Sequence, residues 1–326
     1  MKRKHDRQLW AETHSGDAEC VLRPASEDAS FRSYYRAISK GQSYILMDAP
    51  PQQENILPFI NTQRLMQDVG LHVPTIHADD PELGFMLLED FGNRLYLDAL
   101  NEENVDTLYG DAINSIHTMQ SNIPTADIPK YSEELLRNEL QLFIDWFIVE
   151  HLGEKITDEN QKYLNKLFDL LVNNALEQPQ HFVHRDYHSR NLMVTRENSP
   201  GILDFQDAVL GPVTYDLVSL LRDCYIRWPQ HQVAEWSDQF RQKYNANHQT
   251  DISSDQWQRW FDLMGVQRHL KAIGIFCRLN YRDNKPHFLK DIVRTLDYVI
   301  EASQKQPHIA ELQYLLDRLL PKISQL

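Results

Sequence analysis

The sequence predicts an α+β protein with two lobes: a small N-terminal lobe of about five antiparallel strands plus a helix, and a larger, mainly helical C-terminal lobe. Two observations support this prediction. Short apolar runs separated by turn residues fill the first 90 residues, which is typical of strands joined by tight connections. From about residue 100 onward, apolar residues recur at intervals of three and four, which is typical of amphipathic helices. The predicted lobes cover residues 1–90 and 91–326.

Each element of the N-terminal lobe has its own signal. The third strand ends at Pro50-Pro51, which cannot continue a central strand, and Gly70 ends the helix that follows. We predict helices over residues 6–16 and 52–69, and strands over residues 18–23, 33–39, 43–47, 73–77 and 84–89.

The C-terminal lobe is predicted from helical periodicity. The second of its helices begins at Ser132, a residue type that caps helix N-termini. We predict helices over residues 102–119, 132–151, 157–177, from 214 or 215, and over 229–246, 255–280, 286–304 and 308–324.

Composition restricts the partners of the chain. Of its 326 residues, 42% are hydrophobic and 25% are charged, and the net charge is −14. Nucleic acid is not expected as a partner, because phosphate backbones select basic surfaces. The three cysteines are far apart and show no metal-binding spacing, so we expect reduced thiols in a cytoplasmic protein.

Targeting signals are not expected either. The basic start, Met1-Lys2-Arg3-Lys4, is not followed by an apolar segment, so it does not resemble a secretory signal. No apolar run approaches the roughly 18 residues needed to span a bilayer. We expect a monomer that acts on a small molecule without a membrane partner.

The motif that indicates chemistry runs from His184 to Asn191 and continues at Ile202-Leu203-Asp204-Phe205. Asp186 is followed by Asn191 five residues later and by Asp204 thirteen residues after that. This spacing suits phosphoryl transfer, in which one carboxylate accepts a proton while an amide and a second carboxylate hold Mg²⁺ beside ATP. The first half of the motif also occurs by chance in unrelated proteins. An aspartate inside an apolar strand strengthens the functional interpretation, because an unpaired buried charge is costly.

The segment after Asp204 argues against a protein substrate. A helix is expected to begin near Thr214 or Tyr215, so only about ten residues intervene. Protein kinases need a longer activation segment there, and this chain has Asp-Phe-Gln in place of Asp-Phe-Gly. The short connection favours a small acceptor molecule.

Nucleotide-binding residues are expected in two segments of the first lobe. The polar run over residues 24–32 lies between two strands, as in a flap whose backbone N–H groups reach phosphate oxygens. A plain hairpin fits this run equally well, because it contains no glycine. The second segment is the extended crossing over residues 87–93, whose backbone groups can face an adenine edge. The candidates are Ser30, Phe31, Arg32 and Glu89.

Acceptor-binding residues are expected on two of the later helices. Glu139 and Asp145 are candidates on the helix over 132–151, and a solvent-exposed position is the alternative for both. Helical spacing places Arg268, Lys271, Arg278 and Arg282 on one stripe. This stripe is either a solvated face or an anion-binding wall beside the acceptor. Arg268 and Arg278 are the candidates that we name from it.

The chain resembles the aminoglycoside phosphotransferase/choline kinase-like family, which has a bilobal protein-kinase-like fold. The resemblance rests on the motif above and covers nearly the whole chain. It implies that Asp186 is the catalytic base, that Asn191 and Asp204 are Mg²⁺ ligands, and that His184 and Asp216 support the catalytic loop. It also implies that residues 1–90 bind ATP and that residues 91–326 carry catalysis and substrate binding.

Within that family, the chain is similar to bacterial anomeric kinases that phosphorylate N-acetylmuramate and N-acetylglucosamine at C1 in cell-wall recycling. The similar segments are Asp28–Arg32, Ile45–Pro51, Leu88–Gly92, Gln267–Lys271 and Gly274–Leu279. The resemblance implies a sugar 1-phosphate as product. A kinase of an aminoglycoside or of choline, and a nucleotide-binding pseudokinase without transfer activity, are the alternatives.

One position departs from the wider family. The third strand usually ends in a lysine that contacts the α- and β-phosphates, and here Met47-Asp48 stands in that place. We expect Arg32 or Arg36 to neutralise those phosphates instead, because both lie near the predicted flap.

Overall fold

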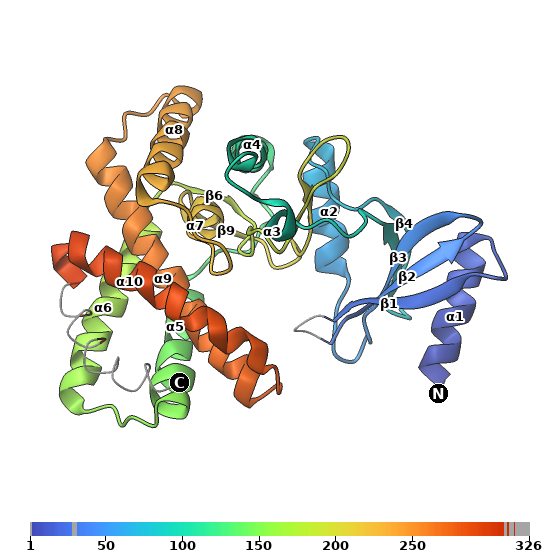
Figure 1. Ribbon diagram of the computed structural model, residues 1–326, viewed down its shortest axis with the longest axis horizontal. Helices are drawn as coiled ribbons and strands as arrows, with labels where there is room; N and C mark the ends of the chain where they lie inside the picture. Colours follow the sequence, from blue (N-terminus) through green and yellow to red (C-terminus); the bar gives the residue numbers. More distant parts are fainter. Residues whose placement is uncertain (1, 28–30, 310–311, 313–315, 317–326) are drawn as a thin grey trace. The chain divides into compact units, whose positions relative to one another are not determined.

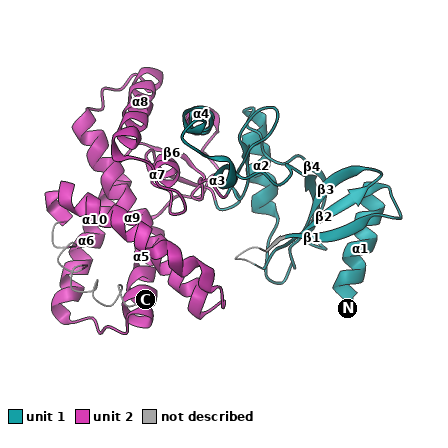
Figure 2. Cartoon of the chain, viewed as in Figure 1, with its two compact units in different colours: residues 1–112, 191–207 teal, residues 113–190, 208–326 magenta. Residues whose placement is uncertain are grey.

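The computed structural model describes residues 2–27, 31–309, 312 and 316. The chain forms two compact units, which Figure 2 distinguishes by colour. Unit 1 contains residues 1–112 and 191–207, and unit 2 contains residues 113–190 and 208–326. A functional boundary near residue 90 remains a prediction.

Unit 1 is built on a five-stranded antiparallel sheet with the strand order β1-β2-β3-β5-β4 (Figure 1). The strands are β1 (Val21–Glu27), β2 (Ser33–Ser39), β3 (Gln42–Asp48), β4 (Ile76–Asp80) and β5 (Phe85–Glu89). The expected number and direction of the strands are therefore confirmed. The first strand starts later than predicted and includes Pro24, which a sheet tolerates because β1 is an edge strand.

The helix α1 (Lys2–Ser15) packs against this sheet (Figure 1). Trp10 and Ala11 are buried against Leu46 of β3 and Phe85 of β5. Removing this apolar area from water is the main force that holds the helix to the sheet.

The helix α2 (Leu57–Asp68) begins five residues later than predicted, because Pro50–Asn55 form turns instead of helix. Its Phe59 packs against Phe205, with ring centres 4.7 Å apart. Unit 1 also contains α3 (Tyr96–Ala99), the first part of α4 (Val105–Asn122), and the hairpin of β7 (Leu192–Met193) and β8 (Gly201–Ile202).

Unit 2 is mainly helical, as expected. The long helix α9 (Ser254–Tyr281) contacts the α-helices α5, α6, α7, α8 and α10 of this unit (Figure 1). The remaining elements are α5 (Glu133–Leu142), the π-helix η1 (Phe143–His151), α6 (Asp158–Glu177), α7 (Tyr215–Leu221), α8 (Gln230–His248), the 3₁₀-helix η2 (Pro286–Asp291), α10 (Ile292–Lys305) and the 3₁₀-helix η3 (Pro307–Ile309), with β6 (Gln180–Val183) paired to β9 (Val209–Pro212).

Two predicted helices are each divided in the structure. The helix over 132–151 is α-helical up to Leu142 and π-helical afterwards, and the helix over 286–304 begins as a 3₁₀-helix. Most of the helix predicted over 308–324 lies outside the described residues. None of the helices described in the two units has the length and apolarity needed to cross a membrane.

Candidate active site

The loop that carries Asp186 is fixed by a buried carboxylate. It follows β6, and the backbone N–H groups of His184 and Arg185 donate to Asp216 over 2.7 and 3.0 Å. Asp216 belongs to the first turn of α7 and is fully buried. Burial raises its pKa to about 7, although the two N–H donors favour its ionised form. The loop is thereby held at two consecutive peptide groups, which suits the supporting role predicted for His184 and Asp216.

Asp186 itself lies in a cationic environment. Burial opposes its ionisation, but the positive charges of Lys271, Arg185 and Arg268 outweigh this effect and lower its pKa to about 2. The carboxylate is therefore ionised at neutral pH and able to accept a proton. A carboxylate that acts as a general base must be ionised at the pH at which the enzyme works.

Glu139 is the centre of a buried polar network in unit 2. It is 5% exposed, so it does not lie on a solvated face. It accepts hydrogen bonds from Tyr131 and Arg185, and its Oε1 lies 3.2 Å from Nζ of Lys271. Lys271 also donates to the hydroxyl of Tyr215 over 3.3 Å. These contacts join α5, the catalytic loop, α7 and α9.

The predicted cationic stripe on α9 does not form one surface. Arg268 and Lys271 are buried, whereas Arg278 is half-buried and Arg282 is exposed. A guanidinium of Arg268 donates to the Cys224 thiol over 3.6 Å. Helical spacing assigned these residues to one line, but other elements enclose the helix at Arg268 and Lys271, and the solvated interpretation is wrong there.

The four predicted acceptor residues are not brought together in one place. Glu139 and Arg268 lie inside the polar core around the catalytic loop. Asp145 is exposed, and its carboxylate accepts a hydrogen bond from Gln141 on the same helical surface, over 2.7 Å.

The predicted metal ligands lie together in unit 1. Nδ2 of Asn191 donates to Oδ2 of Asp204 over 3.3 Å, and the N–H of Leu203 donates to the carbonyl of Asn191 over 2.9 Å. Asp204 has a φ of +63°, an uncommon conformation for a non-glycine residue that recurs at functional sites. Gln206, which replaces the glycine of protein kinases, donates to Oδ1 of Asp204 over 2.8 Å.

This pair suits a magnesium ion that arrives with a nucleotide. Mg²⁺ is usually held by one or two carboxylates together with water and substrate phosphates. No group of three or more histidine, cysteine, aspartate or glutamate side chains that could hold a metal occurs among the described residues. Asn191 and Asp204 therefore fit a site in which phosphates complete the ligand set.

At the end of β3, where the family has a lysine, Asp48 is paired with two arginines. Met47 is fully buried, and Asp48 is held by Arg3 and Arg7 of α1 at 2.6 and 2.9 Å. The two arginines stand four residues apart on one face of a helix. The i, i+4 spacing of Arg3 and Arg7 indicates a paired cationic face, and its contact with Asp48 was not predicted from the sequence.

The two arginines near the flap have different surroundings. Arg36 makes hydrogen bonds of 2.7 and 3.1 Å to Asp90 and one to the carbonyl of Gly92. Arg32 instead lines a cavity of about 240 Å³, with Glu54 at 3.9 Å. Other lining residues of this cavity are Met47, Asn55, Ile56, Pro58, Phe59, Gln206 and Asp207.

Among the other flap candidates, Phe31 is 63% exposed, and its N–H donates to Glu54 over 3.1 Å. Ser30 lies outside the described residues.

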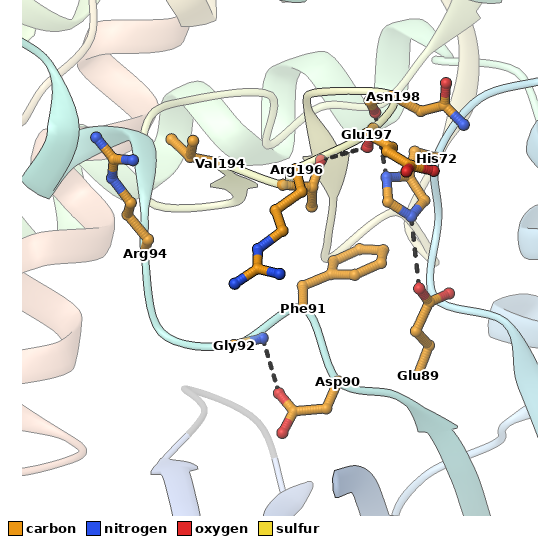
Figure 3. Close-up of a pocket in the computed structure, with 11 residues that line it drawn as sticks. His72, Glu89, Asp90, Phe91, Gly92, Arg94, Val194, Arg196, Glu197 and Asn198 are labelled. Carbon is orange, nitrogen blue, oxygen red and sulfur yellow. Dashed lines mark hydrogen bonds and ion pairs between the residues drawn. The ribbon is translucent and has the colours of Figure 1, made fainter. Parts of the chain in front are cut away.

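A larger cavity of about 760 Å³ in unit 1 contains the remaining candidate, Glu89 (Figure 3). The Glu89 carboxylate accepts a hydrogen bond from Thr75 over 2.9 Å and lies 3.5 Å from the ring of His72. Figure 3 shows the Arg196 side chain extending beside Phe91.

Comparison with known proteins shows which family and which proteins the chain is similar to. Residues 21–256 match the phosphotransferase enzyme family. The chain is 44% identical over 311 residues to the N-acetylmuramate/N-acetylglucosamine kinase of Pseudomonas putida, with 95% of this chain and 90% of that protein covered. It is 38% identical over 326 residues to the protein of the same name from Neisseria meningitidis, with 98% and 97% covered.

Solved structures agree on the fold. A choline kinase from Streptococcus pneumoniae has a TM-score of 0.61 at 13% identity, covering 91% of this chain and 99% of that one. An ADP-bound aminoglycoside phosphotransferase has a TM-score of 0.58 at 16% identity, covering 90% and 97%. The expected α+β, protein-kinase-like fold class is thereby confirmed.

Proposed function

The chain belongs to the phosphotransferase enzyme family, and from this we propose that it transfers the γ-phosphoryl group of ATP to the anomeric hydroxyl of N-acetylmuramate or N-acetylglucosamine. The products are ADP and the sugar 1-phosphate. The observation that supports this acceptor best is the 38–44% identity, over nearly the whole chain, to kinases named for these two sugars.

Asp186 is the proposed catalytic base. Its ionised carboxylate takes the proton of the C1 hydroxyl as the sugar oxygen attacks the γ-phosphorus, and the bond from that phosphorus to the β-γ bridging oxygen breaks. The hydrogen bonds from His184 and Arg185 to Asp216 hold the loop, so that Asp186 needs little reorganisation during the reaction. Asn191 and Asp204 would hold Mg²⁺, which supplies positive charge to the phosphates when bound.

The surroundings of Asp186 also bear on the choice of acceptor. Its pKa is lowered by three nearby cations, Lys271, Arg185 and Arg268. Choline and the aminoglycosides are cations, which carboxylates or aromatic rings would have to stabilise. The cations around Asp186 would oppose a positively charged acceptor, so these two alternatives are less well supported.

A coupled assay of ADP release tests the proposal. N-acetylmuramate, N-acetylglucosamine, kanamycin and choline are compared as acceptors, each with ATP and Mg²⁺. We expect turnover with the two amino sugars and a sugar 1-phosphate as the product. Turnover with kanamycin or choline alone would replace the proposed acceptor, and ATP binding without turnover on any of the four would favour the pseudokinase.

The role of Asp186 is tested in the same assay. Asp186→Asn removes the proton acceptor while keeping the size of the side chain, so kcat should fall about 10²- to 10⁴-fold. ATP binding should remain close to that of the wild type. Asp169→Asn is the matched control, since Asp169 is an exposed carboxylate on α6 paired with Arg137. Near-normal kcat in Asp186→Asn would show that another group is the base.

A further inference from the structure

Arg190 is a cation of the catalytic loop that is held by aromatic rings. Its guanidinium carbon lies 4.5 Å from the centre of the Tyr225 ring and 5.5 Å from that of Phe288. The side chain is half-buried. No carboxylate lies within 4.0 Å of it among the residues that the structure describes. Rings attract the faces of a guanidinium, and Arg190 also makes a side-chain hydrogen bond to Tyr225. An arginine has five N–H donors in one plane, so its other donors still suit a carboxylate.

The neighbouring cations are engaged differently. Lys271 is paired with Glu139 at 3.2 Å, and Arg268 is 6% exposed with Cys224 as its hydrogen-bond acceptor. Both are enclosed in unit 2, where they balance the carboxylates of the unit itself. Arg190 differs from both in its partial exposure and in its aromatic partners.

The position of Arg190 relates it to the reacting group. It follows Asp186 by four residues, so the two α-carbons are at most about 14 Å apart. His188, between them, packs edge-on against Tyr225 with ring centres 5.3 Å apart. Phe288 in turn stacks on Phe276 of α9. The guanidinium is therefore presented by a packed cluster of rings that begins within the catalytic loop.

The two proposed sugars differ in charge, and an arginine can distinguish them by binding a carboxylate. N-acetylmuramate carries a lactyl ether on C3, and its carboxylate is the only charge on the molecule, whereas N-acetylglucosamine is neutral. Resting on the proposed function, we propose that Arg190, presented by Tyr225 and Phe288, binds the lactyl carboxylate while the C1 hydroxyl faces Asp186. Arg190 is then a specificity residue for the anionic sugar.

The test is the ratio of kcat/KM for N-acetylmuramate to that for N-acetylglucosamine. In Arg190→Gln this ratio should fall about 10- to 100-fold, the effect of losing hydrogen bonds to a charged group. The loss should appear mainly as a higher KM for N-acetylmuramate. Arg190→Lys should recover part of the ratio, because it keeps the charge but not the planar pair of donors. Arg137→Gln, on the exposed side of α5, is the control and should leave the ratio unchanged.

A second measurement keeps the test independent of the stability of the variants. The wild-type protein is assayed with the lactyl amide of N-acetylmuramate, which has the same shape without the charge. We expect its kcat/KM to fall at least tenfold below that of the acid. An amide used as well as the acid, or an Arg190→Gln variant that loses both sugars equally, would overturn the role of Arg190 while leaving the proposed function intact. Failure of the wild type on both sugars would refute the proposed function itself.

Discussion

At the scale of single residues, charge environment decides what each candidate can do. Asp186 stays ionised because nearby cations outweigh the cost of its burial. Asp48, at the place of the expected lysine, is neutralised by Arg3 and Arg7 of α1. A carboxylate in that position would otherwise repel nucleotide phosphates.

Arg32 carries the first prediction at this scale. Arg36 is held by Asp90, whereas Arg32 lines a cavity together with Gln206, the partner of Asp204. Arg32→Ala should therefore raise the KM for ATP, by about tenfold for the loss of one charged contact. Steady-state kinetics with varied ATP measure this. Arg23→Ala, on an exposed position of β1, serves as the control, and an unchanged KM would remove Arg32 as a phosphate ligand.

His117 carries a prediction for pH dependence. Burial, with smaller effects of Lys243 and His248, lowers its pKa to about 3, and its ring stacks on Phe240. Its folded-state pKa lies below the unfolded value of about 6.5. The stability that it contributes is therefore present above pH 6.5 and is lost as the pH falls towards 3.

His117→Phe keeps the stacked ring and removes the titration. Between pH 6.5 and 4.5 this variant should lose less free energy of unfolding than the wild type, as measured by urea denaturation at each pH. His231→Phe, at an exposed position on α8, should follow the wild-type dependence. Parallel curves for the wild type and His117→Phe would contradict the prediction.

At the scale of elements, unit 2 depends on the close approach of α9 to the junction of α5 and η1. A Cβ added at Gly274 would lie 2.4 and 2.5 Å from the carbonyl carbon and oxygen of Leu142. These are backbone atoms and cannot rotate away. The same two segments carry the ion pair between Lys271 and Glu139, so their separation also positions the polar network below Asp186.

Gly274→Ala tests this packing. Alanine is normally favoured over glycine inside a helix by about 1 kcal/mol, but here the overlap should dominate and destabilise the protein by about 1–3 kcal/mol. Gly110→Ala in α4 is the matched control, because an added Cβ there meets no atom within 4 Å. The control should stabilise by roughly 0.5–1 kcal/mol. Opposite signs for the two variants in thermal unfolding are expected, and equal signs would refute the argument.

At the scale of the whole molecule, the proposed chemistry is divided between the two compact units. Asp186 belongs to unit 2, and the chain enters unit 1 at Asn191, only five residues later. Asn191, Asp204 and the cavity beside Arg32 all belong to unit 1. We therefore expect unit 1 to bind the nucleotide with its metal, and unit 2 to supply the base and the acceptor contacts.

Ligand-linked stability tests this division. ATP with Mg²⁺ at about 100 times its Kd should raise the free energy of unfolding by about 2.7 kcal/mol. Chelation of the metal should remove most of this gain, and so should Asp204→Asn. Asp79→Asn, an exposed position on β4, should keep it. A full Mg²⁺-dependent gain in Asp204→Asn, measured by differential scanning calorimetry, would exclude Asp204 as a metal ligand.

Local pattern was sufficient for the elements and for the motif. Short apolar runs bounded by turn residues predicted the five strands, and helical spacing predicted most of the helices, because both patterns are local. The boundaries shifted at Pro50–Asn55 and at Phe143, where turns and a π-helix replace regular helix. The spacing of Asp186, Asn191 and Asp204 predicted phosphoryl transfer, since residues a few positions apart around short strands stay close together.

The sequence by itself determined the fold class and predicted the set of reacting groups. Only the tertiary structure decided the partner of each charge: Glu139 for Lys271, Asp90 for Arg36, and the rings of Tyr225 and Phe288 for Arg190. These partners are 35 to 132 residues apart in the chain. Local periodicity cannot predict contacts between residues so far apart. Burial, and with it the strength of each charge interaction, is set by the packing of distant elements.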